Sequence, residues 1–202
     1  IKDLLADMET EPRDRRRLLE EAVLSQEKGV KLLYGVRPTG GVGRDTRLAT
    51  MLTRLYEVTK EPEHLRRAIE VSRKAIESIG KIGWVSGIAE CYWKIARAQD
   101  ALGEHSQAAE SFQRASESYE KAAGKIPQLK DFYHDYTSYM QAWSEIEKAK
   151  QRHAEKEYGR AKENYEAAAN LHKSTQRWSH LSSNHLAWAR LEEAEDQSRT
   201  EQ

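Results

Sequence analysis

The glycine-rich segment GGVGRDT at residues 40–46 is the first place to look for chemistry, because glycines expose backbone N–H groups that can bind phosphate. A nucleotide-binding P-loop requires the pattern G-x₄-G-K-[ST] after a β-strand. Here no lysine follows the glycines, and the preceding segment has the pattern of a helix. We therefore interpret residues 36–45, which read VRPTGGVGRD, as an interhelical loop and expect no nucleotide site.

Histidine and cysteine supply the common metal ligands and nucleophiles, but their spacing here favours neither role. His180 and His185 are five residues apart, which does not place them on one helix face, and the nearest i, i+4 pair is His153 with Glu157. Cys91, the single cysteine, falls between positions predicted to pack inward. No spacing argues for a Ser-His-Asp or Cys-His arrangement. We expect no metal, no cofactor and no enzymatic activity.

Four arginines cluster at the start of a predicted helix, namely Arg13, Arg15, Arg16 and Arg17. Cations in the first turns oppose the helix macrodipole, so this run could serve an acidic partner or RNA. Acidic residues surround it, however, and a solvated face with i, i+4 ion pairs is the favoured interpretation. A nucleic-acid-binding face at Arg13–Arg17 is kept as the alternative hypothesis, against which the formal net charge of +0 argues.

Composition indicates a protein with a thin core and no membrane span. Charged residues make up 33% of the chain and hydrophobic residues 38%, which suits stacked helices that each bury one stripe. No stretch approaches the roughly 20 consecutive apolar residues of a transmembrane helix, and no secretory signal pattern opens the chain. A single cysteine cannot form an internal disulfide. We therefore expect a cytoplasmic location.

Apolar periodicity predicts helices throughout, and no segment shows the alternating pattern of a strand. Pro12 and Pro62 suit first helical turns, and Gly80 suits a helix end. The predicted helices cover residues 12–35, 46–60, 62–79, 84–102, 106–124, 128–155, 157–173 and 177–196.

The segment AECYWKIARAQDALGEHSQAAESFQRAS, which begins at Ala89, resembles the tetratricopeptide repeat (TPR), a pair of helices of about 34 residues. The matching positions hold large and small residues at i, i+3, i+4 and i+7 on the first helix, a turn glycine, and small and aromatic residues on the second helix: Tyr92, Ile95, Ala96, Gln99, Gly103, Ala108, Phe112 and Ala115. Gln99 departs from the pattern, because an aromatic residue is usual there. The best repeat covers residues 89–122, and weaker copies cover 49–80 and 142–173.

The resemblance implies an all-α protein: a right-handed α-solenoid of antiparallel helix hairpins, with about 8 helices, forming a single domain over residues 1–202. Helices at 1–35 precede the repeats, and an incomplete helix pair at 177–202 follows them. The spacing of corresponding alanines, Ala68, Ala108 and Ala161, exceeds 34 residues, so some helices are lengthened. Such lengthened arrays are also similar to SNAP-type trafficking adaptors and to regulatory regions of signalling ATPases.

A TPR-like solenoid binds its partners in a concave groove, and the resemblance assigns groove positions here. They carry mixed charges and an aromatic anchor, and the partner-binding residues that we predict are Trp93, Arg97, Glu90, Asp100, Thr53, Glu57 and Lys150. These residues do not match the lysine and asparagine of the TPR subset that holds chaperone tails. The expected function is a protein-interaction scaffold for a partner protein or peptide, standing alone or as the sensor part of a larger protein. The apolar stripe of Leu186, Ala187 and Leu191 has no predicted partner helix, so we expect either that the chain continues or that this end pairs with another copy by self-association.

Overall fold

The computed structural model describes residues 2–9, 11–36 and 42–200, and these residues are helical or in short connections, with no strand among them. The described helices pack mainly against their sequential neighbours, as an array of helical hairpins would. The all-α prediction is thus confirmed. The chain divides into two compact units, Ile1–Leu102 and Gly103–Gln202, which we describe separately.

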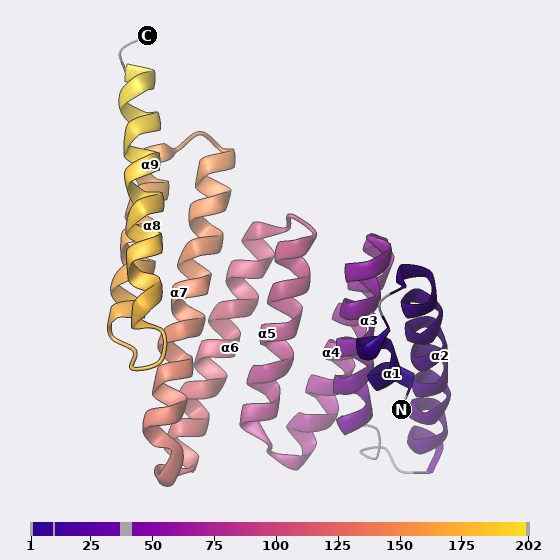
Figure 1. Cartoon of the computed structure of the whole chain (residues 1–202). Helices are drawn as coiled ribbons and strands as arrows, with labels where there is room; N and C mark the ends of the chain where they lie inside the picture. The colour runs from indigo at the N-terminus through magenta and orange to yellow at the C-terminus, as the bar shows by residue number, and fades with distance from the viewer. Residues whose placement is uncertain (1, 10, 37–41, 201–202) are drawn as a thin grey trace. The chain divides into compact units, whose positions relative to one another are not determined.

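Five helices form the first unit (Figure 1): α1 (Lys2–Met8), α2 (Pro12–Val36), α3 (Val42–Thr59), α4 (Pro62–Ile82) and α5 (Val85–Ala101). Its largest core cluster joins α1, α2, α3 and α4 through side chains such as Leu19, Leu52 and Leu55, which are almost fully buried. Pro62 occupies the first turn of α4, where its missing N–H costs nothing. Gly83 follows the helix with φ of 70°, a left-handed conformation that favours glycine.

The second unit contains α6 (His105–Lys125), α7 (Lys130–Ala154), α8 (Tyr158–Lys173) and α9 (Ser182–Thr200), with 3₁₀ turns η1 (Pro127–Leu129) and η2 (Ser179–Leu181). Along this series α6 packs on α7, α7 on α8, and α8 on α9 (Figure 1). Alanines dominate the seam between α7, α8 and α9, with Ala142, Ala149, Ala168 and Ala189 nearly or fully buried. Small side chains let the helix backbones approach closely, which explains how so polar a chain closes a core.

Three connections between helices share one local geometry. Lys60, Gly103 and Lys156 have φ of 58°, 76° and 61°, and each is followed by a glutamate that precedes the next helix. A left-handed residue reverses the chain in a tight turn, and it is unusual for a lysine. The recurrence of this turn after α3, α5 and α7 fits an array built from repeated helix–turn–helix units.

Two predicted boundaries are wrong. Residues 36–45 were expected to be a loop, but Val36 ends α2 and residues 42–45 form the first turn of α3; residues 37–41 lie outside the described part. The hydroxyl of Tyr34 donates a hydrogen bond to the carboxylate of Asp45, which lies in that first turn, where a negative charge favours a helix. Burial raises the pKa of Asp45 despite this hydrogen bond.

The helix expected at 177–196 begins only at Ser182, after η2. Thr175 explains the delay, because its hydroxyl accepts the backbone N–H of Trp178 at 3.1 Å and donates to the carbonyl of His172 at 2.8 Å. Such side-chain hydrogen bonds compete with helix formation. The prediction placed helices at 1–35 but gave bounds only for residues 12–35, and the structure adds α1 at Lys2–Met8, so the described residues form nine α-helices where about 8 were expected.

None of the described helices is both long enough and apolar enough to cross a membrane.

Candidate functional site

The predicted groove residues of the first unit lie on α3 and α5, which contact each other. Lys94 joins the two helices, since its Nζ donates to Thr50 Oγ1 at 2.9 Å and to the carbonyl of Thr46 at 3.1 Å. Of the residues predicted from the resemblance, three are exposed (Glu57, Glu90 and Arg97) and three are half-buried (Thr53, Trp93 and Asp100). Their role in binding a partner stays a prediction.

Lys150, the predicted groove residue of the second unit, is engaged inside the protein. Its Nζ donates to Glu147 Oε1 at 2.7 Å, and Nδ1 of His105 lies 2.8 Å from the other carboxylate oxygen. The Glu147 side chain is fully buried. Lys150 therefore compensates a buried negative charge, a structural role that the sequence did not reveal.

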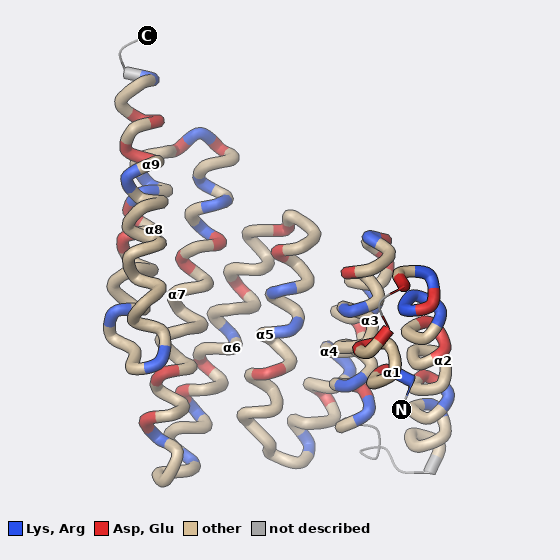
Figure 2. The backbone as a smooth tube through the Cα atoms, in the orientation of Figure 1, with Lys and Arg blue, Asp and Glu red and all other residues tan. Residues whose placement is uncertain are grey.

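Two of the four arginines in the run on α2, Arg16 and Arg17, are compensated by acidic neighbours. Arg16 donates to Glu20 at 2.7 Å and to Glu61 at 3.3 Å. Arg17 donates to Asp14 at 3.2 Å and to Glu21 at 3.4 Å. Figure 2 shows basic and acidic residues alternating along this helix. Arg13 and Arg15 form no ion pair among the described residues, so only part of the positive charge of the run is compensated. Nucleic-acid binding requires positive charge against the phosphate backbone, and at this face it stays the alternative prediction.

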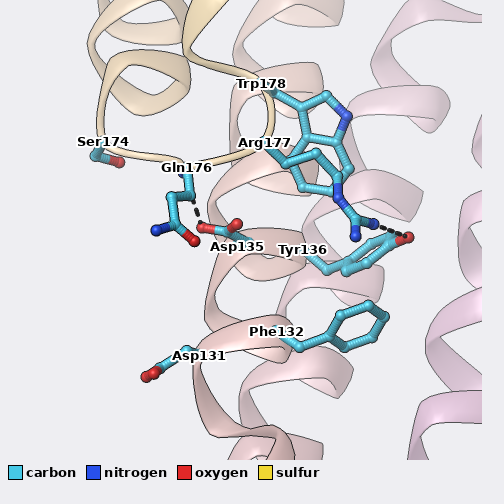
Figure 3. Close-up of a pocket in the computed structure, with 8 residues that line it drawn as sticks. All are labelled: Asp131, Phe132, Asp135, Tyr136, Ser174, Gln176, Arg177 and Trp178. Carbon is cyan, nitrogen blue, oxygen red and sulfur yellow. Dashed lines mark hydrogen bonds between the residues drawn. The ribbon is translucent and has the colours of Figure 1, made fainter.

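A pocket of about 700 Å³ opens in the second unit, between the first turns of α7 and the connection from α8 to η2 (Figure 3). We call it the α7–η2 pocket. Its lining residues come from these two segments alone: Asp131, Phe132, Asp135, Tyr136, Ser174, Gln176, Arg177 and Trp178. The α7 residues form two i, i+4 pairs, one of carboxylates and one of aromatic rings, so they occupy adjacent stripes of the helix.

One wall of the α7–η2 pocket is aromatic. The rings of Phe132 and Tyr136 lie 4.8 Å apart, and the Tyr136 ring meets that of Trp178 edge to face at 4.9 Å. The guanidinium carbon of Arg177 lies 5.7 Å from the ring centroids of both Phe132 and Trp178. One guanidinium nitrogen also donates to the Tyr136 hydroxyl at 3.4 Å, as Figure 3 shows. The aromatic wall is thus a cation–π site that the guanidinium of Arg177 occupies.

The opposite side of the α7–η2 pocket is acidic. Asp135 Oδ1 accepts the backbone N–H of Gln176 at 3.2 Å, which fastens the connection to α7. Within the described residues, neither Asp131 nor Asp135 forms an ion pair with a lysine or arginine, although Arg177 lines the same pocket. The lining therefore carries two carboxylates against one guanidinium.

Behind the aromatic wall, stacked rings continue into the core. Trp178 stacks on Tyr139 at 4.1 Å, and His172 lies 5.6 Å from Tyr139 and stacks on His185 at 5.0 Å. His172 is fully buried, and neither ring nitrogen has a hydrogen-bond partner in the described structure. Burial, together with the nearby His185 and His180, lowers the pKa of His172 to about 4. The Tyr139 ring that supports Trp178 thus contacts a neutral histidine without a hydrogen-bond partner in the described structure.

A second concavity, of about 530 Å³, lies on α6, α7 and α8, and we call it the α6–α8 groove. Its lining is polar: Ser106, Ala109, Glu110, Gln113, Ser144, Lys148, Gln151, Arg152, Glu155 and Asn164. No aromatic ring lines it, and its charged side chains are paired with one another or with close neighbours, as with Lys148 and Glu145 at 2.6 Å.

The sequence analysis did not identify the α7–η2 pocket. A signal was present in the segment DFYHDY at 131–136, where an acidic residue followed by an aromatic one recurs after four positions. This repetition places two carboxylates and two rings on adjacent helix stripes. What the sequence could not supply was Trp178 and Arg177, which come from a distant connection.

No protein-family model, curated protein or solved structure matches this chain. The resemblance to TPR proteins therefore rests on the motif residues and on the sequential packing of the helices.

Proposed function

We propose that this protein is an interaction scaffold, a TPR-like right-handed solenoid of helix hairpins, and that it binds a partner protein or peptide. The observation that carries the proposal is the α7–η2 pocket, which presents a tryptophan, a tyrosine, a phenylalanine and an arginine around one concavity. Tryptophan, tyrosine and arginine are the residues enriched in interface hot spots. The groove around Trp93 and Arg97 remains the second surface on which a partner would be sought.

The polar groups of the α7–η2 pocket suit recognition better than catalysis. Among the residues that line the pocket, Ser174 is the only one with an aliphatic hydroxyl group. Its Oγ donates a hydrogen bond to the carbonyl of Leu171 at 2.7 Å. A serine nucleophile needs a base that accepts its proton, and a backbone carbonyl at the end of a helix does not act as one. The exposed Phe132 ring, by contrast, gives a partner apolar surface to bury.

The experiment is to capture partners with the intact protein by crosslinking, purify the main one, and measure its affinity for variants. We expect Phe132→Ala to weaken binding about tenfold or more while leaving the melting temperature nearly unchanged, because 42% of this residue is already exposed. Trp188→Ala is the matched control, since it removes an exposed ring on α9 that does not line the pocket.

The double variant Trp93→Ala, Arg97→Ala tests the other surface. Loss of binding there, with parental affinity for Phe132→Ala, would show that the predicted groove around Trp93 and Arg97 recognises the partner and that the α7–η2 pocket does not. Parental affinity for every variant would overturn the proposed function.

A further inference from the structure

The α7–η2 pocket already holds a side chain of known chemistry, and this occupant indicates the ligand. Resting on the proposed function, we infer that the pocket recognises an arginine side chain of the partner, which takes the place that Arg177 now occupies. The position of Arg177 shows that a guanidinium fits in this pocket. Its guanidinium carbon lies 5.7 Å from two ring centroids, and one of its nitrogens donates to the Tyr136 hydroxyl.

The internal occupant is held loosely. Arg177 is exposed and lies in the connection between α8 and η2, outside any helix. Its single hydrogen bond, at 3.4 Å, is at the long limit for such a contact, and it forms no ion pair within the described residues. Cation–π contacts at exposed sites are weak. A ligand that brings further contacts can therefore displace Arg177 at little cost.

Charge on the opposite side of the pocket selects a cation. Asp131 and Asp135 lie one helical turn apart, without a cationic partner in the described structure, and the pocket lining keeps a net negative charge even with Arg177 included. An acidic ligand would meet both carboxylates. A basic ligand gains attraction from them and from the ring faces of Phe132 and Trp178.

Arginine fits the site better than lysine does. A guanidinium is planar and stacks on aromatic faces while its edge donates several hydrogen bonds. Here the faces are supplied by Phe132 and Trp178 and an acceptor by the Tyr136 hydroxyl. The Asp135 carboxylate is turned towards Gln176 (Figure 3), so it contributes negative charge to the pocket and not a direct hydrogen bond at this place. A lysine ammonium could use the charge of the carboxylates but would leave the planar stacking unused.

The test uses the full chain and three synthetic peptides, acetyl-Gly-Ser-X-Ser-Gly-amide, in which X is arginine, citrulline or lysine. Citrulline keeps the shape of arginine and removes its charge. Binding is followed by the NMR shift of the Trp178 indole N–H, assigned with the Trp178→Phe variant. We expect the arginine peptide to bind about fivefold more tightly than the citrulline peptide, and the lysine peptide to lie between them.

Two variants of the pocket should change the affinity for the arginine peptide in opposite directions. Asp131→Asn with Asp135→Asn should weaken binding of the arginine peptide about fivefold, whereas Glu163→Gln, an exposed glutamate on α8, should not. Arg177→Gln should strengthen binding about threefold, because it removes the internal competitor, whereas Arg190→Gln on α9 should have no effect.

The outcomes separate this inference from the proposed function. Equal binding of the arginine and citrulline peptides, or no binding of either, overturns arginine recognition, while the Phe132→Ala assay still judges the scaffold function. Weaker binding of the arginine peptide by Arg177→Gln also overturns it, because Arg177 would then contribute to the binding surface instead of competing for it.

Discussion

The two ends of α7 border concavities of similar size and different chemistry. Near its first turns the α7–η2 pocket encloses about 700 Å³ between aromatic rings and carboxylates without a cationic partner. Near its last turns the α6–α8 groove encloses about 530 Å³ among polar side chains that are paired with one another. Volume alone therefore does not distinguish a binding site here. Exposed rings and uncompensated charge do, because only they leave interactions for a ligand to make.

The α6–α8 groove satisfies its own charges. Glu145 accepts from Lys148 and from Asn164, each at 2.6 Å. Arg152 donates to Glu155 at 3.2 Å and to Glu157 at 2.7 Å. Any ligand that used these groups would first have to break an existing pair, so most of the gain would be cancelled.

The buried residues behind the two ends of α7 also differ in charge. Behind the α7–η2 pocket the ring stack passes through His172, a buried and neutral base, to His185. Towards the other end of α7, buried Glu147 is matched by Lys150 and His105. The stability of the end near the α7–η2 pocket thus depends on His172 staying neutral. The stability of the other end depends on the charge of Glu147 keeping its partners Lys150 and His105. This difference gives the ends distinct responses to pH and to mutation.

The largest effect that we predict is acid destabilisation through His172. Its pKa is about 4 in the folded protein and 6.5 in its ordinary range, so below pH 6.5 the unfolded chain binds the proton and the folded chain does not. The stabilising contribution is fully present above pH 6.5 and is lost as the pH falls to about 4. The loss is on the order of 3 kcal/mol in the free energy of unfolding.

Urea unfolding between pH 7.5 and pH 4 measures this effect. The variant His172→Phe should show a flatter decline than the parent, because it keeps a ring in the stack and removes the titrating group. His180→Gln removes an exposed histidine on η2 that contributes to the lowered pKa of His172, so it should flatten the decline only slightly. Burial also lowers the pKa of His185, which acts in the same direction. Parallel curves for the parent and His172→Phe would show that His172 does not limit stability in acid.

An intermediate effect is expected when the buried charge at the other end of α7 is removed. Glu147→Gln deletes the carboxylate but keeps an oxygen that can accept from Lys150. His105 and Lys150 retain 25% and 30% side-chain exposure, so water still solvates them. We therefore expect a loss of about 1–2 kcal/mol, below the cost of a fully buried unpaired charge.

Thermal and urea unfolding at pH 7.5 give this value, with Glu110→Gln as a control at an exposed glutamate on α6. Peptide binding at the α7–η2 pocket should be unchanged in Glu147→Gln. A change in the free energy of binding larger than the change in the free energy of unfolding would mean that the two ends of α7 are coupled and do not respond independently.

The sequence predicted the helices well because their apolar stripes are periodic over several turns. It failed where a side chain overrides the local pattern, as Thr175 does by delaying the start of α9 and Asp45 does by supporting an early start of α3. The helix Lys2–Met8 is too short for periodicity to identify, and its Ala6 is buried only through contacts with the core cluster of the first unit.

The candidate site was less predictable than the fold. Resemblance assigned Lys150 to a groove surface, but the structure places its ammonium on a buried carboxylate that no repeat pattern encodes. The α7–η2 pocket combines a helix with a connection about 40 residues later in the chain, through the contact of Gln176 with Asp135. A side chain on an irregular connection has no periodic signal, so Trp178 and Arg177 could be located only in three dimensions.

The smallest predicted effect concerns Arg152 in the α6–α8 groove. Arg152→Ala removes ion pairs with Glu155 and Glu157 whose side chains are 36–42% exposed, and such pairs contribute little in water. We expect the melting temperature to change by about 2 °C or less, and the difference from the parent to shrink further in high salt, which screens exposed charges. Partner affinity should stay at the parental value, because the groove offers no uncompensated group for a partner to use. If Arg152→Ala instead weakened partner binding more than Phe132→Ala does, the self-paired groove would be the recognition surface, and exposed rings would no longer distinguish the two ends of α7.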